Sequence, residues 1–271
     1  MDLFQIILLG FVQAVTEWLP LSSKTITTFV YMELFRNNSS TVISALLFLH
    51  SGTLLAAIVY FRTHLYLLLK TFFCSPFSFK VHFESKIGFL FSAILMTGVV
   101  GVPLLLAQKQ ALPMLDGKSI YLLMGAGLLI TSFFLSSKKA AVSRSAESAT
   151  WKDGILVGIL QGLSALPGVS RAGTTTAGLV WRGFSPESAF HLSFLLSIPT
   201  IFAAEMLFLG FQDSSFVSLP ISDGILLMSS SFIFGYLTID ILLKIAQRLN
   251  LALVAFSFGL LIIFFGLWGL S

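Results

Sequence analysis

This 271-residue sequence is poor in cysteine and in charged residues. Its single cysteine, Cys74, cannot form an internal disulfide, so a disulfide scaffold is excluded, and there is no CxxC or zinc-binding spacing. Asp, Glu, Lys and Arg make up 10% of the chain, against about 25% in a typical soluble domain. Hydrophobic residues make up 56% instead, which excludes a soluble domain, a disordered chain and a collagen-like chain. The composition predicts an integral membrane protein.

Six segments are long and apolar enough to cross the hydrocarbon core of a bilayer, which takes roughly 20 helical residues. Helices are expected because lipid offers no partner to exposed backbone groups, and no ten-residue alternating pattern indicates a barrel. The fold class is therefore an all-α polytopic membrane protein. We place its six spans at residues 41–60, 86–107, 119–137, 186–210, 222–240 and 251–270.

The basic residues predict which side of the membrane each loop faces. Sixteen Lys and Arg against twelve Asp and Glu give a net charge of +4, and the bases fall between the apolar segments. This pattern reflects topology and anionic membrane lipids, so we expect no nucleic-acid partner. The loops at 61–86, 138–152 and 241–250 are predicted to be cytoplasmic, which places both termini outside the cell membrane, plasma or inner.

Two further regions, 3–34 and 153–184, begin as apolar helices and then break at a proline, Pro20 in the first and Pro167 in the second. Each resumes with small and hydroxyl-bearing residues. Polar, proline-broken backbone is tolerated at membrane depth only where protein or a wet cavity covers it. We therefore interpret both regions as re-entrant helical hairpins.

The two hairpins also resemble each other in sequence. The pattern Pro-x-x-Ser-[Lys/Arg]-x-x-Thr-Thr starts at Pro20 and again at Pro167, and three spans follow each hairpin. Because an odd number of spans changes sides, the single membrane domain 1–271 would contain repeat one, 1–140, and an inverted repeat two, 150–271. Such repeats are typical of transporters whose site lies at the repeat interface. Chance similarity between two serine-rich stretches is the alternative interpretation.

The hairpins contain three ionisable residues, Glu17, Lys24 and Arg171. A charge at the bilayer centre costs about 2.5–3.5 kcal/mol on insertion scales, so such residues are functional candidates. One acid and two bases would converge if the hairpin tips meet, and this combination suits phosphate: Arg171 offers a planar fork, Lys24 a point charge, and the helix from Ala172 its positive end. Further phosphate-binding candidates are Ser22, Ser23, Ser170, Gly173, Thr174 and Thr175.

Several roles remain open for the other polar residues. Glu17 could bind a divalent cation, handle a proton, or form a buried ion pair with Arg171 that locks the hairpins and opens to admit ligand. His50 and His191 are interpreted first as hydrogen-bonded helix residues, although either could reach the site.

Four segments carry a resemblance to the undecaprenyl-diphosphatase family, the integral-membrane bacitracin-resistance type. Residues 167–175 resemble the family's Pro-Gly-x-Ser-Arg-Ser-Gly-x-Thr motif, and 16–23 fit Thr-Glu-Phe-Leu-Pro-x-Ser-Ser. Residues 193–199 fit Ser-Phe-Leu-Leu-x-x-Pro, and 50–56 are similar to a further family segment. The length, the number of spans and the repeat layout match over the whole chain.

The resemblance implies removal of the terminal phosphate from a C55 isoprenoid diphosphate, which leaves the monophosphate carrier lipid for peptidoglycan and other envelope polymers. It implies polyprenyl diphosphate and monophosphate lipids as partners and Mg²⁺ or Ca²⁺ as a cofactor, and it leaves a homodimer open. Glu17 would bind the metal or assist proton transfer, and Ser23 would be the nucleophile or position the phosphate. Arg171 would clamp the diphosphate, with Ser170 and Thr175 as hydrogen-bond donors.

Three departures from the family pattern fall in the first hairpin. Gln13 stands where the family commonly has a second acid, Ile26 where it has a histidine, and Lys24 where it has a neutral residue. Losing a positioned acid–base group forfeits about 10²–10⁴-fold in rate. These changes keep phosphate binding and weaken the case for hydrolysis.

Two classes of function follow. We favour a polyprenyl-diphosphate phosphatase whose base has moved to His50, His191 or Glu17 itself. The alternative is a hydrolysis-deficient polyprenyl-phosphate flippase of the same fold, in which Lys24 and Arg171 offer a phosphate to either side. A weaker third hypothesis is a sensor or resistance factor that only sequesters the lipid.

Overall fold

The computed structural model is helical throughout its regular elements, apart from one isolated bridge between Arg144 and Phe184. It describes residues 1–36, 41–74, 85–136, 143–210, 219–246 and 248–268.

Among these residues, six helices are long and apolar enough to cross a membrane, which confirms the predicted number of spans. On α6, Phe91, Leu95 and Val99 recur every fourth residue and are all more than half exposed, so one face of this helix is apolar and uncovered. A chain with such faces is a multi-pass membrane protein. The six helices are α3 (Val42–Tyr60), α6 (Lys86–Ala111), α7 (Gly117–Leu135), α10 (Pro186–Gly210), α11 (Ile221–Ala246) and α12 (Leu251–Trp268).

The structure differs from the prediction in the region after the first span. Part of the predicted loop at 61–86 is a helix, α4 (Arg62–Cys74), which has no buried residue. Its bases Arg62 and Lys70 suggested a loop, but a helix with an exposed polar face tolerates both. Two short segments on either side of the middle of the chain are η3 (Leu112–Met114) and η4 (Ala146–Ser148).

The first proline-broken region consists of α1 (Leu3–Trp18), α2 (Ser23–Phe29) and the π-helical turn η1 (Val30–Leu34). Leu19 ends α1 in an extended conformation, φ −89° and ψ 147°, because the residue before a proline is driven out of the helical region. The chain then reverses, and Phe35 lies 6.4 Å from Phe4, measured between ring centroids. These elements therefore form a helical hairpin.

The second proline-broken region consists of α8 (Trp151–Gly162), η5 (Leu163–Ala165) and α9 (Arg171–Trp181). Leu166, which precedes Pro167, is again extended at φ −66° and ψ 141°. Gly168 follows with a positive φ of 82°, and its Cα faces the Met124 carbonyl of α7 so closely that a side chain would collide with it. This turn therefore requires glycine for its backbone conformation and for its packing.

A buried acid links the start of α8 to the end of α9 in the second hairpin. Asp153, at the start of α8, accepts hydrogen bonds of 2.9 Å from Arg144 Nη2 and 2.7 Å from Arg182 Nε, just past the end of α9. Burial raises the pKa of this carboxyl, but the hydrogen bonds from Arg144, Arg182 and Thr150 outweigh it and hold the pKa at about 2. The carboxylate thus stays ionised and ties α8 to α9.

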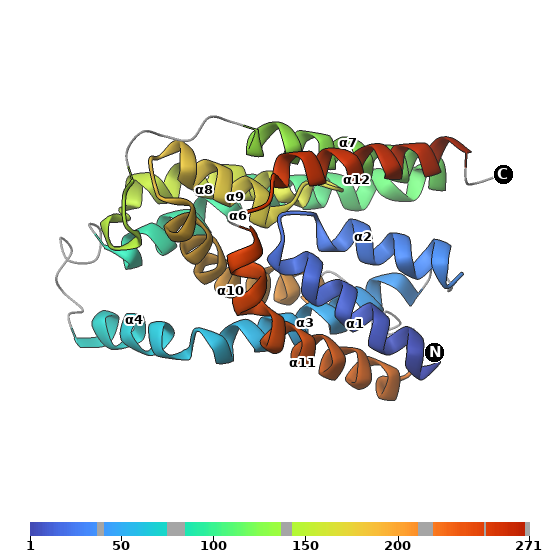
Figure 1. Ribbon diagram of the computed structural model, residues 1–271, viewed down its shortest axis with the longest axis horizontal. Coiled ribbons are helices and arrows are strands. Elements are labelled where there is room, and N and C mark those ends of the chain that lie inside the picture. The colour runs from blue at the N-terminus through green and yellow to red at the C-terminus, as the bar shows by residue number, and fades with distance from the viewer. Residues whose placement is uncertain (37–40, 75–84, 137–142, 211–218, 247, 269–271) are drawn as a thin grey trace.

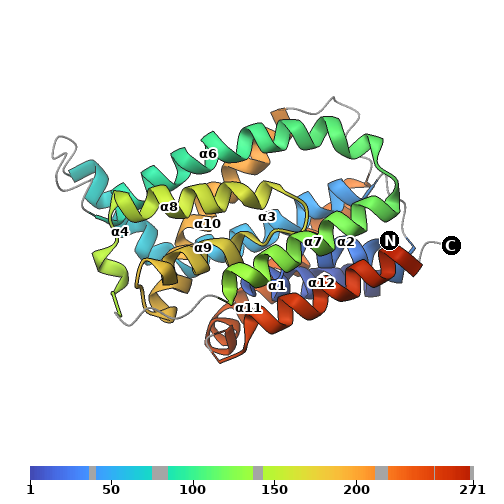
Figure 2. The ribbon, with the colours of Figure 1, turned by 90° about the horizontal axis from the view of Figure 1, so that it is seen from above.

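The two hairpins point toward each other from opposite ends of the molecule. The start of α1 lies at the same end as the last turn of α12, whereas α8 begins at the other end, near α4 (Figures 1 and 2). Each hairpin packs its first helix on the middle span of the other half of the chain: α1 contacts α11, and α8 contacts α6. Helices α7 and α12 pack against each other beside them.

Candidate active site

The carboxylate of Glu17 is the centre of a buried polar cluster where the two hairpin turns meet. Arg171 Nη2 of α9 lies 2.5 Å from Glu17 Oε1, and Ser23 Oγ of α2 donates to Oε2 at 2.6 Å. Gln13 Nε2, one turn earlier on α1, also donates to Oε2, at 3.2 Å. The side chains of Glu17 and Arg171 are only 6% and 13% exposed, so the charges compensate each other away from solvent.

The end of α1 is fixed so that Glu17 faces the second hairpin. Trp18 is buried, packs edge-on against Phe194 of α10 with centroids 5.4 Å apart, and donates from Nε1 to the Gly235 carbonyl of α11 at 3.2 Å. Pro20, in the turn after α1, lies next to Gly173 of α9. The anchored tryptophan and the contacting turns position the carboxylate.

Gln13 links the two helices of the first hairpin. Its amide nitrogen donates to Glu17, and its carbonyl oxygen accepts from Thr27 Oγ1 at 3.1 Å. Gln13 and Glu17 share a face because they are four residues apart on α1. Sequence reasoning missed Thr27, although it aligns with Thr174 in the repeated pattern, and this alignment could have identified it.

The structure separates the two histidines that the sequence left as auxiliary candidates. His50 of α3 is buried, with Nε2 3.6 Å from Glu17 Oε2 and Nδ1 2.8 Å from the Leu46 carbonyl. Because a carbonyl only accepts, Nδ1 carries the proton in the neutral ring and Nε2 does not. His191 instead packs against Phe61 and His64, with ring centroids 5.5 and 4.8 Å away. His50 therefore belongs to the cluster, and His191 lies in a separate aromatic group.

The hydroxyl groups at the start of α9 are buried and bonded within the protein. Ser170 caps the helix, since its Oγ accepts from the Gly173 N–H at 3.2 Å. Thr174 Oγ1 donates to the Ser170 and Arg171 carbonyls, both at 3.1 Å. Thr175 Oγ1 lies 2.6 Å from Ser193 Oγ, in the segment of α10 that the sequence resemblance had marked. These groups hold α9 in place beneath Arg171.

Lys24 differs from the other charged residues near the hairpin turns. It is exposed, and its ammonium has no hydrogen-bond or ion-pair partner among the residues that the structure describes. Its charge interacts through space with Glu17, Arg171 and Glu205 of α10. Glu205 accepts from Ser51 Oγ at 3.2 Å through Oε2, while its buried Oε1 has no partner in the described part of the chain. The sequence places Glu205 towards the outer end of the fourth span, as an interface residue, and Ser51 in the segment 50–56, and it predicts neither as part of the site.

The turn into α2 contains Ser22, the remaining phosphate-binding candidate of the first hairpin. It is buried and adopts a left-handed backbone conformation, with φ 57°. Its Oγ lies 3.0 Å from Thr25 Oγ1.

The described residues do not offer a divalent cation a set of protein ligands. No group of three or more His, Cys, Asp or Glu side chains among them is arranged to hold a metal ion. Glu17, the predicted ligand, already receives Arg171 on one oxygen and Ser23 and Gln13 on the other. Hard cations such as Mg²⁺ and Ca²⁺ take several oxygen ligands, and this cluster offers one carboxylate whose oxygens are already hydrogen-bonded, so these protein groups alone do not hold the ion.

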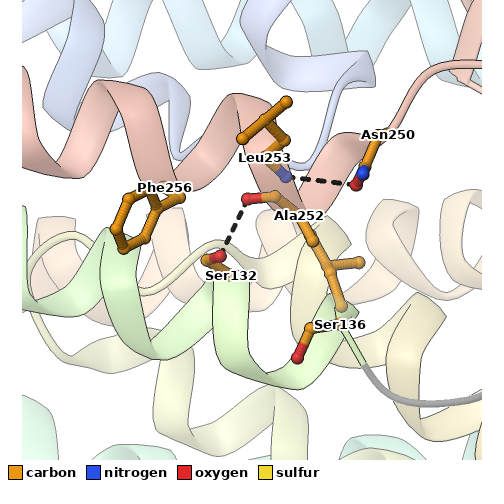
Figure 3. Close-up of a pocket in the computed structure, with 7 residues that line it drawn as sticks. Ser132, Ser136, Asn250, Ala252, Leu253 and Phe256 are labelled. Atoms are coloured by element: carbon orange, nitrogen blue, oxygen red, sulfur yellow. Dashed lines mark hydrogen bonds between the residues drawn. The ribbon is translucent and has the colours of Figure 1, made fainter.

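One pocket lies away from this cluster, between the end of α7 and the start of α12 (Figure 3). Its volume is about 370 Å³, and Ser132 Oγ donates across it to the Ala252 carbonyl at 2.8 Å. Its lining contains no charged side chain, so it lacks a cation to pair with a phosphate.

The fold and the site define a multi-pass membrane protein in which two proline-broken hairpins share a buried cluster of one acid, one arginine, a serine hydroxyl and a histidine. Comparison with known proteins agrees over nearly the whole chain. Residues 6–268 match the family described as bacitracin resistance protein BacA, and the chain belongs to this family.

Curated relatives from archaea extend the comparison. The undecaprenyl-diphosphatase of Methanococcoides burtonii is 36% identical over 265 residues, which cover 96% of this chain and 97% of the relative. That of Methanothrix thermoacetophila is 34% identical over 263 residues, covering 96% of each chain. That of Sulfurisphaera tokodaii is 34% identical over 266 residues, covering 96% of this chain and 95% of the relative.

Proposed function

We propose that the protein is an undecaprenyl-diphosphatase, a membrane hydrolase that removes the terminal phosphate from a C55 isoprenoid diphosphate and leaves the monophosphate carrier lipid. The observation that carries this function is the contact of Glu17 with both Ser23 and Arg171, in a chain whose relatives bear that name over their whole length. A hydroxyl, a carboxylate that can accept its proton, and an arginine for phosphate oxygens form a suitable set for phosphoryl transfer.

The reaction we propose uses Ser23 as the nucleophile. Its Oγ forms a bond to the terminal phosphorus, the bond from that phosphorus to the bridging oxygen breaks, and the lipid monophosphate leaves. The proton of Ser23 passes to Glu17, whose Oε2 already accepts it at 2.6 Å. Water then attacks the phosphoserine, the bond from phosphorus to Oγ breaks, Oγ regains a proton, and inorganic phosphate departs. Arg171 turns from Glu17 to the phosphoryl oxygens during both steps.

His50 is our candidate for the acid–base group that the family pattern places at position 26. Ile26 is buried in an apolar cluster with Trp18 and Phe194, so that position has become part of the core. His50 Nε2, unprotonated in the neutral ring, lies 3.6 Å from the oxygen of Glu17 that takes the serine proton. It can accept that proton in turn, which restores Glu17 as a base.

Hydrolysis is tested with purified wild-type protein and defined C55 diphosphate. Release of inorganic phosphate that is lost in Glu17→Gln supports the proposed function. Wild-type protein that releases no phosphate yet binds the monophosphate lipid would favour the flippase instead. A homodimer stays a prediction from the resemblance and is tested by the mass of the protein–detergent complex.

We also propose that both hairpins are re-entrant and that repeat two is inverted relative to repeat one, with both termini outside and the loops at 61–86, 138–152 and 241–250 cytoplasmic. The opposite directions of the hairpins and the matched packing of α1 on α11 and α8 on α6 support this. Cys74, exposed at the end of α4 and the chain's only cysteine, provides a test. An impermeant maleimide should label it only after the cells are permeabilised, and labelling in intact cells would reverse the topology.

A further inference from the structure

The three ionisable residues near the hairpin turns carry one more positive charge than negative charge. Arg171 is matched by Glu17 at 2.5 Å, whereas Lys24 has no ion-pair partner among the described residues. Gln13, an amide, donates to Glu17 where a carboxylate would have added a negative charge. The formal sum over the three hairpin residues Glu17, Lys24 and Arg171 is therefore one positive charge, and counting Glu205 of α10 as ionised brings it to zero, so no negative charge is in excess.

This balance disfavours a free divalent cation in the site. A cation would meet one carboxylate whose two oxygens already accept from Arg171, Ser23 and Gln13, and it would be repelled by Lys24. The same balance favours an anion with several oxygens. An ammonium supplies three N–H donors and can contact oxygens of both phosphates of a diphosphate.

We infer that Lys24 is the built-in counter-cation for the diphosphate headgroup, so that this protein binds its substrate without a divalent metal ion. The inference rests on the proposed function, because it takes a lipid diphosphate as the ligand. Lys24 follows the nucleophile Ser23 directly in the chain, and it is exposed while Ser23 is buried. The charge of Lys24 interacts through space with that of Glu17, which accepts from the Ser23 hydroxyl, so a headgroup that reaches Ser23 also comes within the field of the Lys24 ammonium.

Glu205 of α10 compensates part of the charge of Lys24 when no ligand is bound. Its charge interacts with that of Lys24, and its buried Oε1 has no hydrogen-bond partner in the described part of the chain. Lys24 thus interacts through space with two acids, Glu17 and Glu205, and among the described residues it makes no direct ion pair with either. The incoming diphosphate provides the direct contact that the protein itself does not make.

The inference is tested by calorimetric binding of farnesyl diphosphate, a short-chain probe, to full-length protein in detergent with a strong chelator or with Mg²⁺. For the wild type, we expect affinities that agree within about threefold in the two conditions, a difference of less than 1 kcal/mol. Lys24→Thr should weaken binding at least about tenfold in chelator and regain it with Mg²⁺. Lys24→Arg should bind without metal, and Lys118→Thr, which removes an exposed lysine on α7, should match the wild type.

A second variant shifts the charge of the site further in the negative direction than Lys24→Thr alone. Gln13→Glu combined with Lys24→Thr replaces an amide by a carboxylate and removes the ammonium, so its probe binding should depend on Mg²⁺. The inference is overturned if chelator abolishes wild-type binding, or if Lys24→Thr behaves like Lys118→Thr in both conditions.

Phosphate release from C55 diphosphate, measured in parallel, separates this inference from the proposed function. Chelator-resistant probe binding without any phosphate release would refute hydrolysis and support the role of Lys24. Phosphate release that stops in chelator and returns with Mg²⁺ would support hydrolysis and refute metal-free binding.

Discussion

The two hairpins carry a base at equivalent positions of their shared pattern, Lys24 in α2 and Arg171 in α9, and the two bases have different surroundings. Arg171 is 13% exposed and paired with Glu17, while Lys24 is exposed and has no ion-pair partner in the described chain. A repeated motif has thus placed one base in an ion pair between the hairpins, and we propose that the other serves a ligand. The comparison teaches that the repeated pattern fixes the positions of Lys24 and Arg171, whereas Glu17 on α1 determines which of the two forms an ion pair.

The turns of the hairpins differ in the same way. Gly168 has a φ of 82° and lies against the α7 backbone, whereas Ser22 in the first turn has a φ of 57° and keeps a side chain that reaches Thr25. The second turn is packed against its neighbour, and the first has room for a side chain. Both turns are packed within the protein, and the first carries the groups proposed to react.

The largest expected effect comes from breaking the pair between the hairpins. Arg171→Ala leaves Glu17 buried without its main partner, so we expect a loss of about 3–5 kcal/mol in the free energy of unfolding in detergent. Phosphate release should fall about 10²–10³-fold, because a group that stabilises the phosphoryl charge is gone. Lys24→Ala is the matched control and should change unfolding by no more than about 0.5 kcal/mol. Equal destabilisation by the two variants would erase the difference between the bases.

The role of His50 in proton transfer can be tested by comparing a substitution of His50 with the same substitution of His191. His50→Gln should lower the rate of phosphate release about 10²-fold and remove one limb of its pH profile, because the group that accepts the proton from Glu17 is lost. His191→Gln, in the separate aromatic group, should keep both the rate and the profile. An unchanged pH profile in His50→Gln would show that Glu17 acts without it.

A smaller effect is expected at the second turn. Gly168→Ala forces a side chain into a left-handed conformation and against the Met124 carbonyl, so the free energy of unfolding should fall by about 1–3 kcal/mol. Gly98→Ala on α6 is the control, since no atom lies within 4 Å of the added carbon, and it should gain up to about 1 kcal/mol. Destabilisation by Gly98→Ala of the same size would mean that the packing of the turn is not the cause.

The smallest effect is expected at the first turn. Ser22→Gly relieves the left-handed strain but loses the contact with Thr25 and adds freedom to the unfolded chain, so unfolding should change by less than about 1 kcal/mol. Thermal and denaturant unfolding in detergent would measure it. A loss as large as that of Gly168→Ala would contradict the proposed difference between the turns.

The sequence predicted the six spans well because hydrophobic length is a strong signal at membrane depth. The observed α6 ends at Ala111 and α11 at Ala246, beyond the predicted ends, because a helix continues past the apolar core where polar residues are exposed. The helix α4 was missed for the same reason: bases in an exposed amphipathic segment suggested a loop. The breaks before Pro20 and Pro167 were predictable because proline restricts the residue that precedes it.

The site was predictable as a set of residues and not as a set of contacts. The sequence placed Glu17, Ser23 and Arg171 in one candidate cluster, and the structure brings them together. It named a buried ion pair of Glu17 with Arg171 as one of several open roles for Glu17, and the structure contains this pair, but choosing among those roles depends on side-chain directions at the turns. Nor could it choose between His50 and His191, because the choice depends on how α3 and α10 are rotated about their axes.

Single-turnover release of phosphate from C55 diphosphate by the wild type and Glu17→Gln tests most directly whether the two hairpins form one hydrolytic site. We predict that the wild type releases one phosphate per site, and that replacing the carboxylate by an amide of the same shape lowers the rate about 10²–10⁴-fold. Release by Glu17→Gln at the wild-type rate would show that the reaction does not pass through the contact between the hairpins.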